Sequence, residues 1–327
     1  MSRVFGSMRR MVLAPSLEQV SFAALGFPVT ASATTVHLEA IPQAVICGFE
    51  WGIEGPSVAE LERRLALVDP ERRGFAYEGA TMACTVLDAT AGGSRTRELL
   101  EGPGRPHYFL ACIGIGFAMA RLPRVLWRKV LPDLTGIPYH PTMSWLAVDG
   151  YGFDKAYFDQ KTWIVGQRRP RPYPWQGHAD YFPRAFDQGV GRALWFRHAA
   201  DPAAVAATVD GFAAPRRADL WSGVGLAATF AGGCDTVGFE SLRALAAEHG
   251  PHLAQGAVFA AKARTWAGYC PEHTETAVRA LAGLSSEAAA ELADAAAVDG
   301  HGDGPAYEQW RRVIRARIAQ PAGISDS

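Results

Sequence analysis

Three acidic residues and one arginine lie in or beside apolar, glycine-containing segments of this chain. The acids are Glu78, Asp149 and Asp187, and the arginine is Arg192. A carboxyl group in apolar surroundings can act as a general acid, a general base or a metal ligand, and a guanidinium can orient an anionic or carbonyl group. We therefore take these four residues as the candidate catalytic set. The alternative is structural, because the same groups could form an interhelical hydrogen-bond network that satisfies buried polar atoms.

Other polar and aromatic residues near the same glycines would bind a ligand if the segments enclosed a cavity. The candidates are Tyr77, Tyr151, Gln188, Trp195, Trp221, Gln255 and Lys262. Aromatic residues are also concentrated, with 12 of them between positions 151 and 196. We expect most of these residues to fill a packed helical core, and the excess also suits a flat or conjugated apolar ligand.

The elements that must position these side chains are predicted from a recurring spacing of glycine. Seven times, a glycine is followed four residues later by another small residue in an apolar run, with a period of about 35 residues. Glycine inside a helix costs roughly 0.8–1 kcal/mol relative to alanine, so we expect these sites to permit close helix packing. The pattern predicts an all-α fold of stacked helical-hairpin repeats, as in an α-solenoid or an α/α toroid. The pairs are Gly48/Gly52, Gly79/Ala83, Gly114/Ala118, Gly152/Ala156, Gly189/Ala193, Gly223/Ala227 and Gly256/Ala260.

Helix bounds follow from apolar periodicity, caps and prolines. We expect the glycine-containing helices at 38–54, 73–90, 106–121, 142–160, 182–197, 215–231 and 250–267. Shorter partner helices are expected at 94–101, 123–131, 201–211 and 236–249.

The chain divides into three expected regions. Residues 1–35 lack the repeat and are interpreted as an N-terminal arm, 36–300 as the helical-repeat domain, and 301–327 as a C-terminal capping helix and tail. The segment 167–175 contains three arginines, three prolines and two aromatic residues, so we expect an irregular loop. Such a loop could contact a ligand or a partner at the mouth of the aromatic-rich region, or it could be a solvated linker.

Composition and motif content exclude several classes of protein. The chain has 327 residues, a net charge of −1 and a pI near 6.8, which argues against a nucleic-acid-binding protein. No apolar run reaches the ~18 residues of a transmembrane segment. The nine histidines show no metal-ligand spacing and the five cysteines form no Cys-x-x-Cys pair, so we expect no metal site and a cytoplasmic protein. No recognised cofactor motif occurs, so the cofactor remains unknown.

Six strings of the sequence resemble an uncharacterised bacterial family of similar length that is encoded in enediyne antibiotic biosynthesis clusters. The strings are APSLEQVSF (14–22), GFAYEG (74–79), DGYGF (149–153), FDQGVGRALWF (186–196), RADLWSGVG (217–225) and HLAQGAVFAAKAR (252–264). The resemblance implies a role beside the iterative polyketide synthase that makes a linear conjugated polyene, the precursor of the enediyne core. The family has no assigned activity, so the resemblance implies no catalytic residues.

Two functions from different classes are consistent with these observations. In the first, the protein acts on or binds a hydrophobic polyene polyketide intermediate, with Glu78 or Asp187 as acid or base and Arg192 as the orienting group. In the second, it is a non-catalytic helical-repeat scaffold or carrier for other enediyne-core proteins. The sequence leaves open whether the protein is an enzyme.

Overall fold

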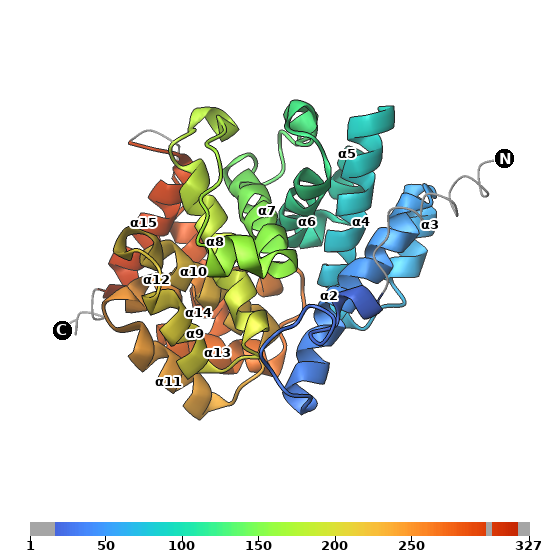
Figure 1. Cartoon of the computed structure of the whole chain (residues 1–327). Helices are drawn as coiled ribbons and strands as arrows, with labels where there is room; N and C mark the ends of the chain where they lie inside the picture. The colour runs from blue at the N-terminus through green and yellow to red at the C-terminus, as the bar shows by residue number, and fades with distance from the viewer. Residues whose placement is uncertain (1–16, 299–302, 320–327) are drawn as a thin grey trace.

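A computed structural model describes residues 17–298 and 303–319, and this part of the chain is helical with no strand (Figure 1). The all-α prediction is thus confirmed for the described residues. None of their helices is long and apolar enough to cross a membrane. The α-helices are α2 (Ala33–Ile53), α3 (Val58–Leu65), α4 (Pro70–Ala91), α5 (Arg95–Glu101), α6 (Tyr108–Arg121), α7 (Trp145–Phe158), α8 (Phe182–Arg197), α9 (Pro202–Asp210), α10 (Ala214–Ala231), α11 (Thr236–Ala246), α12 (Gly250–Trp266), α13 (Glu272–Ala282), α14 (Ser286–Ala295) and α15 (Ala306–Ala319).

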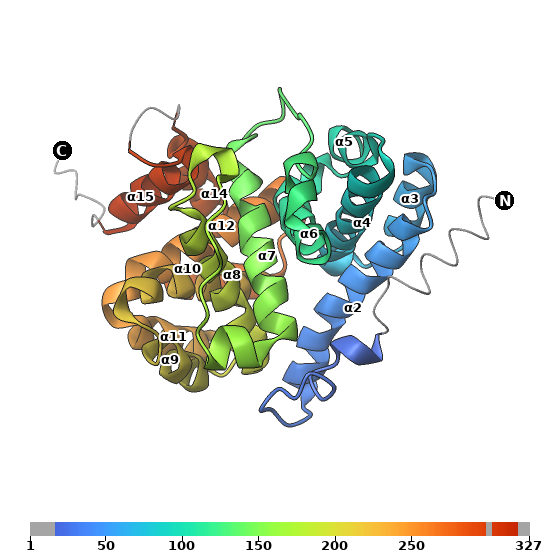
Figure 2. The same cartoon turned by 45° about the horizontal axis from the view of Figure 1, so that its top comes forward.

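Seven long helices pack in the order in which they occur in the chain, namely α2, α4, α6, α7, α8, α10 and α12. Figure 2 shows α6, α7 and α8 side by side in the middle of this series. The two ends of the series also touch. His37 Nε2 on α2 lies 2.7 Å from the carbonyl oxygen of Ala231 on α10, and Arg264 of α12 donates to the carbonyl oxygen of Glu71 on α4 at 2.7 Å. The series therefore bends until its first two helices meet its last two.

Glycines mark the points where these helices approach most closely. A Cβ atom on Gly79 would lie under 3.0 Å from the carbonyl oxygen of Val45 on α2, and one on Gly223 would collide in the same way with Gln188 on α8. Gly114, Gly189 and Gly256 make equivalent contacts with the preceding long helix. The predicted contact between neighbouring glycine helices is confirmed at all five positions. Whether the helices are copies of one hairpin of about 35 residues stays a prediction.

The geometry of the contacts differs from the expected flat strip of residues spaced four apart. Glycines spaced two apart project about 200° from each other on a helix, so they face different neighbours. On α8, Gly189 faces Asp149 of α7, whereas Gly191 faces Leu220 of α10. One glycine of each such pair contacts the helix before it and the other contacts the helix after it.

Most expected helix bounds agree with the structure to within a few residues. The segment expected as a helix at 123–131 is instead a 3-10 helix, η3 (Arg124–Lys129), flanked by Pro123. Of the arm 1–35, the described part holds the short 3-10 helix η1 (Glu18–Val20) and the first turn of α2, while residues 1–16 lie outside the described residues. The division into three regions stays a prediction.

Candidate functional site

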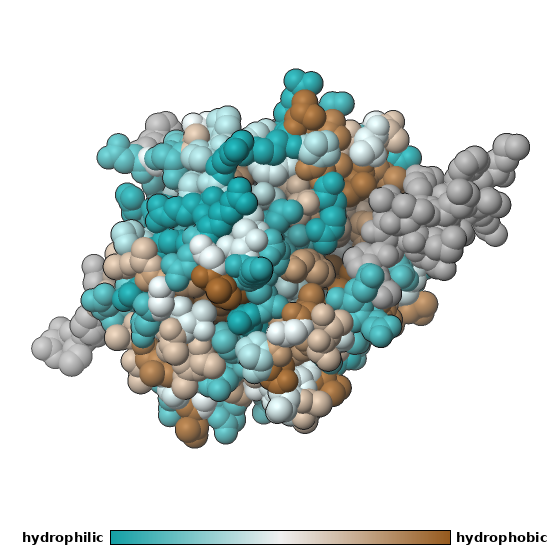
Figure 3. Space-filling model, viewed as in Figure 1, coloured by the Kyte–Doolittle hydropathy of each residue, from teal (hydrophilic) through white to brown (hydrophobic). Residues whose placement is uncertain are grey.

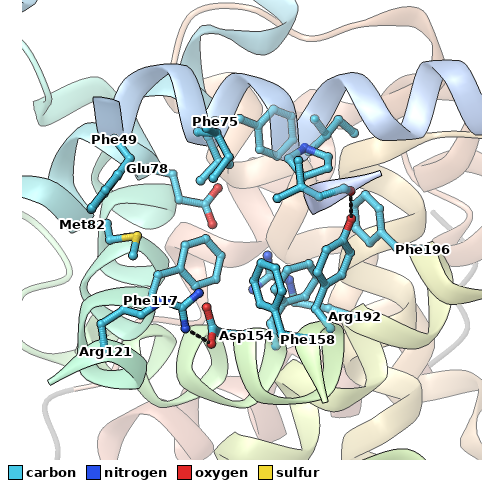
Figure 4. Close-up of a pocket in the computed structure, with 17 residues that line it drawn as sticks. Phe49, Phe75, Glu78, Met82, Phe117, Arg121, Asp154, Phe158, Arg192 and Phe196 are labelled. Atoms are coloured by element: carbon cyan, nitrogen blue, oxygen red, sulfur yellow. Dashed lines mark hydrogen bonds and ion pairs between the residues drawn. The ribbon is translucent and has the colours of Figure 1, made fainter. Parts of the chain in front are cut away.

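An apolar pocket opens between α2, α4, α6, α7 and α8 (Figure 4). The space between its walls, including solvent outside its open mouth, amounts to about 660 Å³. Seven of its lining residues are aromatic: Phe49, Phe75, Phe117, Phe153, Tyr157, Phe158 and Phe196. The pocket therefore offers ring faces and edges on several sides, a lining suited to a flat or conjugated apolar molecule.

Glu78 projects its carboxyl group into this pocket from α4 (Figure 4). Phe75 and Met82, three residues before and four after it, face the same way, as helical spacing requires. The residue is 1% exposed, and among the described residues its carboxyl group has no hydrogen bond or ion pair. Burial raises the pKa of Glu78 to about 8, although the positive charge of Arg192 opposes the shift. We call this cavity the Glu78 pocket.

Arg192 of α8 also lines the Glu78 pocket, and it is held by Asp149 of α7. The Nη1 atom of Arg192 donates to Oδ1 of Asp149, and both side chains are buried. The guanidinium lies over the ring of Phe153 at 4.8 Å. Arg192 is therefore a fixed positive charge that lowers the pKa of Glu78 without forming an ion pair with it.

A second ion pair lines the same pocket on its more exposed side. Arg121 Nη1 donates to Asp154 Oδ1 at 2.7 Å, and the Arg121 guanidinium lies 5.1 Å from the centroid of the Phe158 ring (Figure 4). Phe158 is 40% exposed and Arg121 has 36% of its side chain exposed, whereas Asp154 is buried. We take Arg121 and Phe158 to mark the mouth of the pocket.

A separate polar cluster lies deeper, where α15 packs against α12. Its centre is Arg311, whose side chain is 0% exposed. The guanidinium donates to Tyr181, Asp219, Ser222, Gln255 and Glu308 over 2.6–3.3 Å, and Gln188 donates to Tyr181 and Asp219. We call these seven residues the Arg311 network.

The Arg311 network keeps the carboxyl group of Glu308 ionised. Burial alone would raise the pKa of Glu308, but the positive charges of Arg311, Arg184 and Arg315 hold it down to about 2. Tyr181 donates a further hydrogen bond to Glu308 Oε2 at 2.8 Å. The network is thus a fully paired structural cluster.

Comparison with known proteins places the chain in a family. The family model described as "Protein of unknown function (DUF1702)" matches residues 4–318. The chain belongs to the DUF1702 family. No curated protein and no solved structure is similar enough to match it.

The sequence-predicted catalytic residues of this DUF1702 member fall in two places. Glu78 and Arg192 line the Glu78 pocket, and Asp149 lies behind Arg192 as its ion-pair partner. Asp187 lies elsewhere: its two carboxylate oxygens accept from Nε and Nη2 of Arg216 at 2.9 and 2.6 Å. Asp187 therefore has a buried structural partner and does not line the pocket.

The predicted ligand-binding residues do not line the Glu78 pocket. Gln188 and Gln255 belong to the Arg311 network, and Lys262 pairs with Asp294 at 2.7 Å. The four aromatic candidates serve packing: Tyr77 stacks on His107, Tyr151 packs on Trp127, Trp195 donates to the carbonyl oxygen of Gly232, and Trp221 is buried in the core.

The sequence pattern singled out neither Arg121 nor Arg311 as a site residue, whereas Asp154 was one of the polar residues expected to converge on a cavity. Arg121 and Asp154 are 33 residues apart, so only their placement on neighbouring helices α6 and α7 brings them together. Arg311 lies between the buried residues Trp310 and Ile314 on α15. The one available signal was an arginine among the apolar residues of the predicted C-terminal capping helix, because a charge that becomes buried there must find partners.

The arginine- and proline-rich segment 167–175 is irregular up to Pro174, as predicted, with the 3-10 helix η6 (Trp175–Gly177) at its end. It does not line the Glu78 pocket. Tyr173 packs on Trp127 and Phe182, and Trp175 is buried. The surface over this part of the molecule, beside α8, is largely hydrophilic (Figure 3).

Proposed function

We propose that the Glu78 pocket binds a linear, conjugated, hydrophobic molecule and that Glu78 exchanges a proton with it. The observation that carries this proposal is a buried carboxyl group that has no hydrogen-bonding partner within residues 17–298 and 303–319 and that faces a cavity with an aromatic lining. The resemblance to proteins of enediyne clusters supplies the candidate ligand, the polyene polyketide intermediate. On this proposal the protein works in the cytoplasm with other proteins of enediyne-core assembly.

The chemistry expected of Glu78 follows from its surroundings. A carboxyl group whose pKa is raised to about 8 is mostly protonated at neutral pH, yet it can still lose its proton. It can therefore donate its proton to a polyene carbon, which leaves a delocalised cation, and the resulting carboxylate can then act as a base that removes a proton from that cation and restores a neutral polyene. The fixed charge of Arg192 would stabilise the Glu78 carboxylate that forms when the proton is donated.

The alternative function is a non-catalytic carrier or scaffold built from helical repeats. The recurring glycine contacts between long helices support it, because stacked repeats commonly present binding surfaces. In that case the pocket would shield the polyene, and Glu78 would have no chemical role. The two functions differ in the result expected when Glu78 is replaced by a residue of the same shape that cannot exchange a proton.

Glu78→Gln separates these functions, because glutamine keeps the shape of the side chain but cannot exchange a carboxyl proton. We would titrate the wild type and this variant with a synthetic all-trans linear polyene and follow its absorbance. We would also measure deuterium incorporation into the polyene in D₂O by mass spectrometry. The matched control is Glu62→Gln, which makes the same change at an exposed position on α3.

We expect both variants to bind the polyene, and only Glu78→Gln to lose deuterium incorporation. Equal incorporation by Glu78→Gln and the wild type would remove Glu78 from the chemistry. If the wild type and both variants bind the polyene but none of them incorporates deuterium, the carrier function is favoured. A wild type that does not bind the polyene would overturn the proposal.

A further inference from the structure

Two histidines and one glutamate from three different helices meet where the ends of the helix series touch. They are His37 on α2, Glu71 in the first turn of α4, and His273 on α13. One ring nitrogen of each histidine and one carboxylate oxygen of Glu71 lie within 4.8 Å of one another. We propose that these three side chains bind a divalent transition-metal ion such as Zn²⁺. This site is separate from the Glu78 pocket. The spacing of the histidines in the sequence had predicted no metal site.

The two histidines are oriented as metal-binding histidines usually are. A ligating imidazole commonly donates its other ring N–H to a carbonyl oxygen, which fixes the ring and leaves the remaining nitrogen free to coordinate. Here, Nε2 of His37 lies 2.7 Å from the carbonyl oxygen of Ala231, and Nε2 of His273 lies 3.1 Å from that of Phe230. With Nε2 as the donor, Nδ1 is the unprotonated nitrogen in both rings.

The carboxylate of Glu71 completes the donor set. Its Oε1 atom lies 3.9 Å from Nδ1 of His273, and among the described residues it has no hydrogen bond. Arg264 approaches Glu71 but donates to its backbone carbonyl oxygen, so the carboxylate is not consumed by that arginine. Two imidazoles and one carboxylate are a common ligand set for zinc, with the fourth position open to water.

The spacing requires only a small adjustment. Ligand atoms around a tetrahedral zinc ion lie about 3.3 Å apart, so the donors must close in by at most about 1.5 Å. All three side chains are partly exposed, and rotation about their side-chain bonds can supply this shift. His37 also borders an open surface hollow with Cys234 and Asp235, which gives an ion a path from solvent.

A metal at this position would join the first helices of the series to the last. His37 and Glu71 belong to α2 and α4, and His273 belongs to α13 near the end of α10. An ion that binds only the folded arrangement stabilises it by mass action. We therefore expect Zn²⁺ to raise the melting temperature of the protein.

The test is a Zn²⁺ titration of protein stripped with EDTA, measured by calorimetry, together with Co²⁺ absorbance to report the coordination geometry. Glu71→Gln removes the anionic ligand and leaves the histidine–carbonyl bonds in place. The matched control, Glu272→Gln, makes the same charge change at an exposed position next to His273 on α13. We expect one equivalent of Zn²⁺ bound by the wild type and by Glu272→Gln, and binding weaker by about tenfold or more in Glu71→Gln.

His37→Gln and His273→Gln extend the test, since glutamine can still donate to the α10 carbonyl oxygens. If these variants fail to fold, Glu71→Gln alone decides the matter. Zn²⁺ binding that is absent from the wild type, or equally strong in Glu71→Gln, would overturn the proposal. The two histidines would then serve only to cap the C-terminal carbonyl groups of α10.

Discussion

The Glu78 pocket and the Arg311 network shift the pKa of a buried glutamate in opposite directions. In the pocket, Glu78 faces aromatic rings and its pKa is raised to about 8. In the network, Glu308 is 2% exposed, yet three arginines and a tyrosine hold its pKa near 2. Both carboxyl groups lose similar contact with water, so the difference comes from the partners that the fold provides.

This comparison separates a group that can react from one that holds structure. A fully paired ion resists any change in protonation, because losing its charge breaks several hydrogen bonds at once. A carboxyl group without a partner changes protonation near neutral pH and so suits proton transfer. The contrast is the physical reason for placing the chemistry at Glu78 and not at the more numerous polar groups of the network.

The largest effect should come from removing the centre of the network. Arg311→Met fills a similar volume but removes the fully buried cation that Glu308 and Asp219 share, and leaves them only the partly exposed Arg184 in common. Breaking a buried pair in this way costs about 3–5 kcal/mol, so we expect a large loss in the free energy of unfolding measured in urea. A loss below about 1 kcal/mol would show that the network is not the structural cluster described here.

The next effect is an opposite dependence of stability on pH at the two glutamates. Because the pKa of Glu78 is raised from 4.5 to about 8, the folded state binds more protons than the unfolded state between these values. Glu78 therefore lowers stability progressively as pH rises through that window. Glu78→Gln removes this pH dependence. We therefore expect the free energy of unfolding of the variant to rise, relative to that of the wild type, by a few kcal/mol between pH 5 and about pH 9.

Glu308 should show the reverse behaviour. Its pKa is lowered from 4.5 to about 2, so its stabilising contribution is complete above the unfolded pKa and disappears as pH falls toward 2. We expect Glu308→Gln to be less stable than the wild type by a constant amount from about pH 6 to about pH 9. Urea denaturation of both variants between pH 5 and about pH 9 tests the two predictions. If the free energy of unfolding changed with pH in the same way in Glu78→Gln and Glu308→Gln, the two regions would not differ as described here.

Glycine replacements should cost about the same in both regions, because both depend on the same helix contacts. Gly79→Ala beside the pocket and Gly223→Ala beside the network would each place a methyl group against a backbone carbonyl oxygen. Overpacking of this kind costs about 1–3 kcal/mol or more, and Gly223→Leu should be worse. The control is Gly250→Ala at the start of α12, where an added Cβ would meet no atom within 4 Å beyond its chain neighbours and its own helix backbone, and it should not lower the melting temperature. An unchanged melting temperature for Gly223→Ala would refute the close contact.

The sequence predicted the helices well because their signals are local. Caps, prolines and apolar spacing act within one or two turns, so the bounds of α8, for example, were predicted at 182–197 as observed. The glycines also reported close packing, since a helix-destabilising residue needs a compensating contact. The sequence did not reveal that Gly189 and Gly191 face different neighbours, because that requires the positions of both adjacent helices.

The sequence could not predict which residues pair with the buried polar groups of the folded structure. Glu78 and Asp187 look alike in sequence, each preceding or neighbouring a glycine in an apolar helix. Asp187 pairs with Arg216 from 29 positions away, whereas Glu78 faces a mainly apolar lining and forms no ion pair with the described residues. We therefore expect Asp187→Asn to destabilise the protein instead of acting only on function, because it would leave Arg216 buried with a neutral partner.

The smallest effect should come from the ion pair at the mouth of the pocket, which is the exposed counterpart of Arg311. Arg121→Gln removes a guanidinium that has 36% of its side chain exposed and that pairs with Asp154 at 2.7 Å. Burial already raises the pKa of Asp154, so this carboxyl group can take up a proton when its cation is lost. We expect a loss of about 1 kcal/mol at neutral pH, read from urea denaturation, and a smaller loss at lower pH, where protonated Asp154 needs no cation. Arg128→Gln, at an exposed position on η3, provides the comparison for loss of a surface arginine. If Arg121→Gln were as damaging as Arg311→Met, the mouth would be part of the rigid core, and ligand entry would have to occur elsewhere.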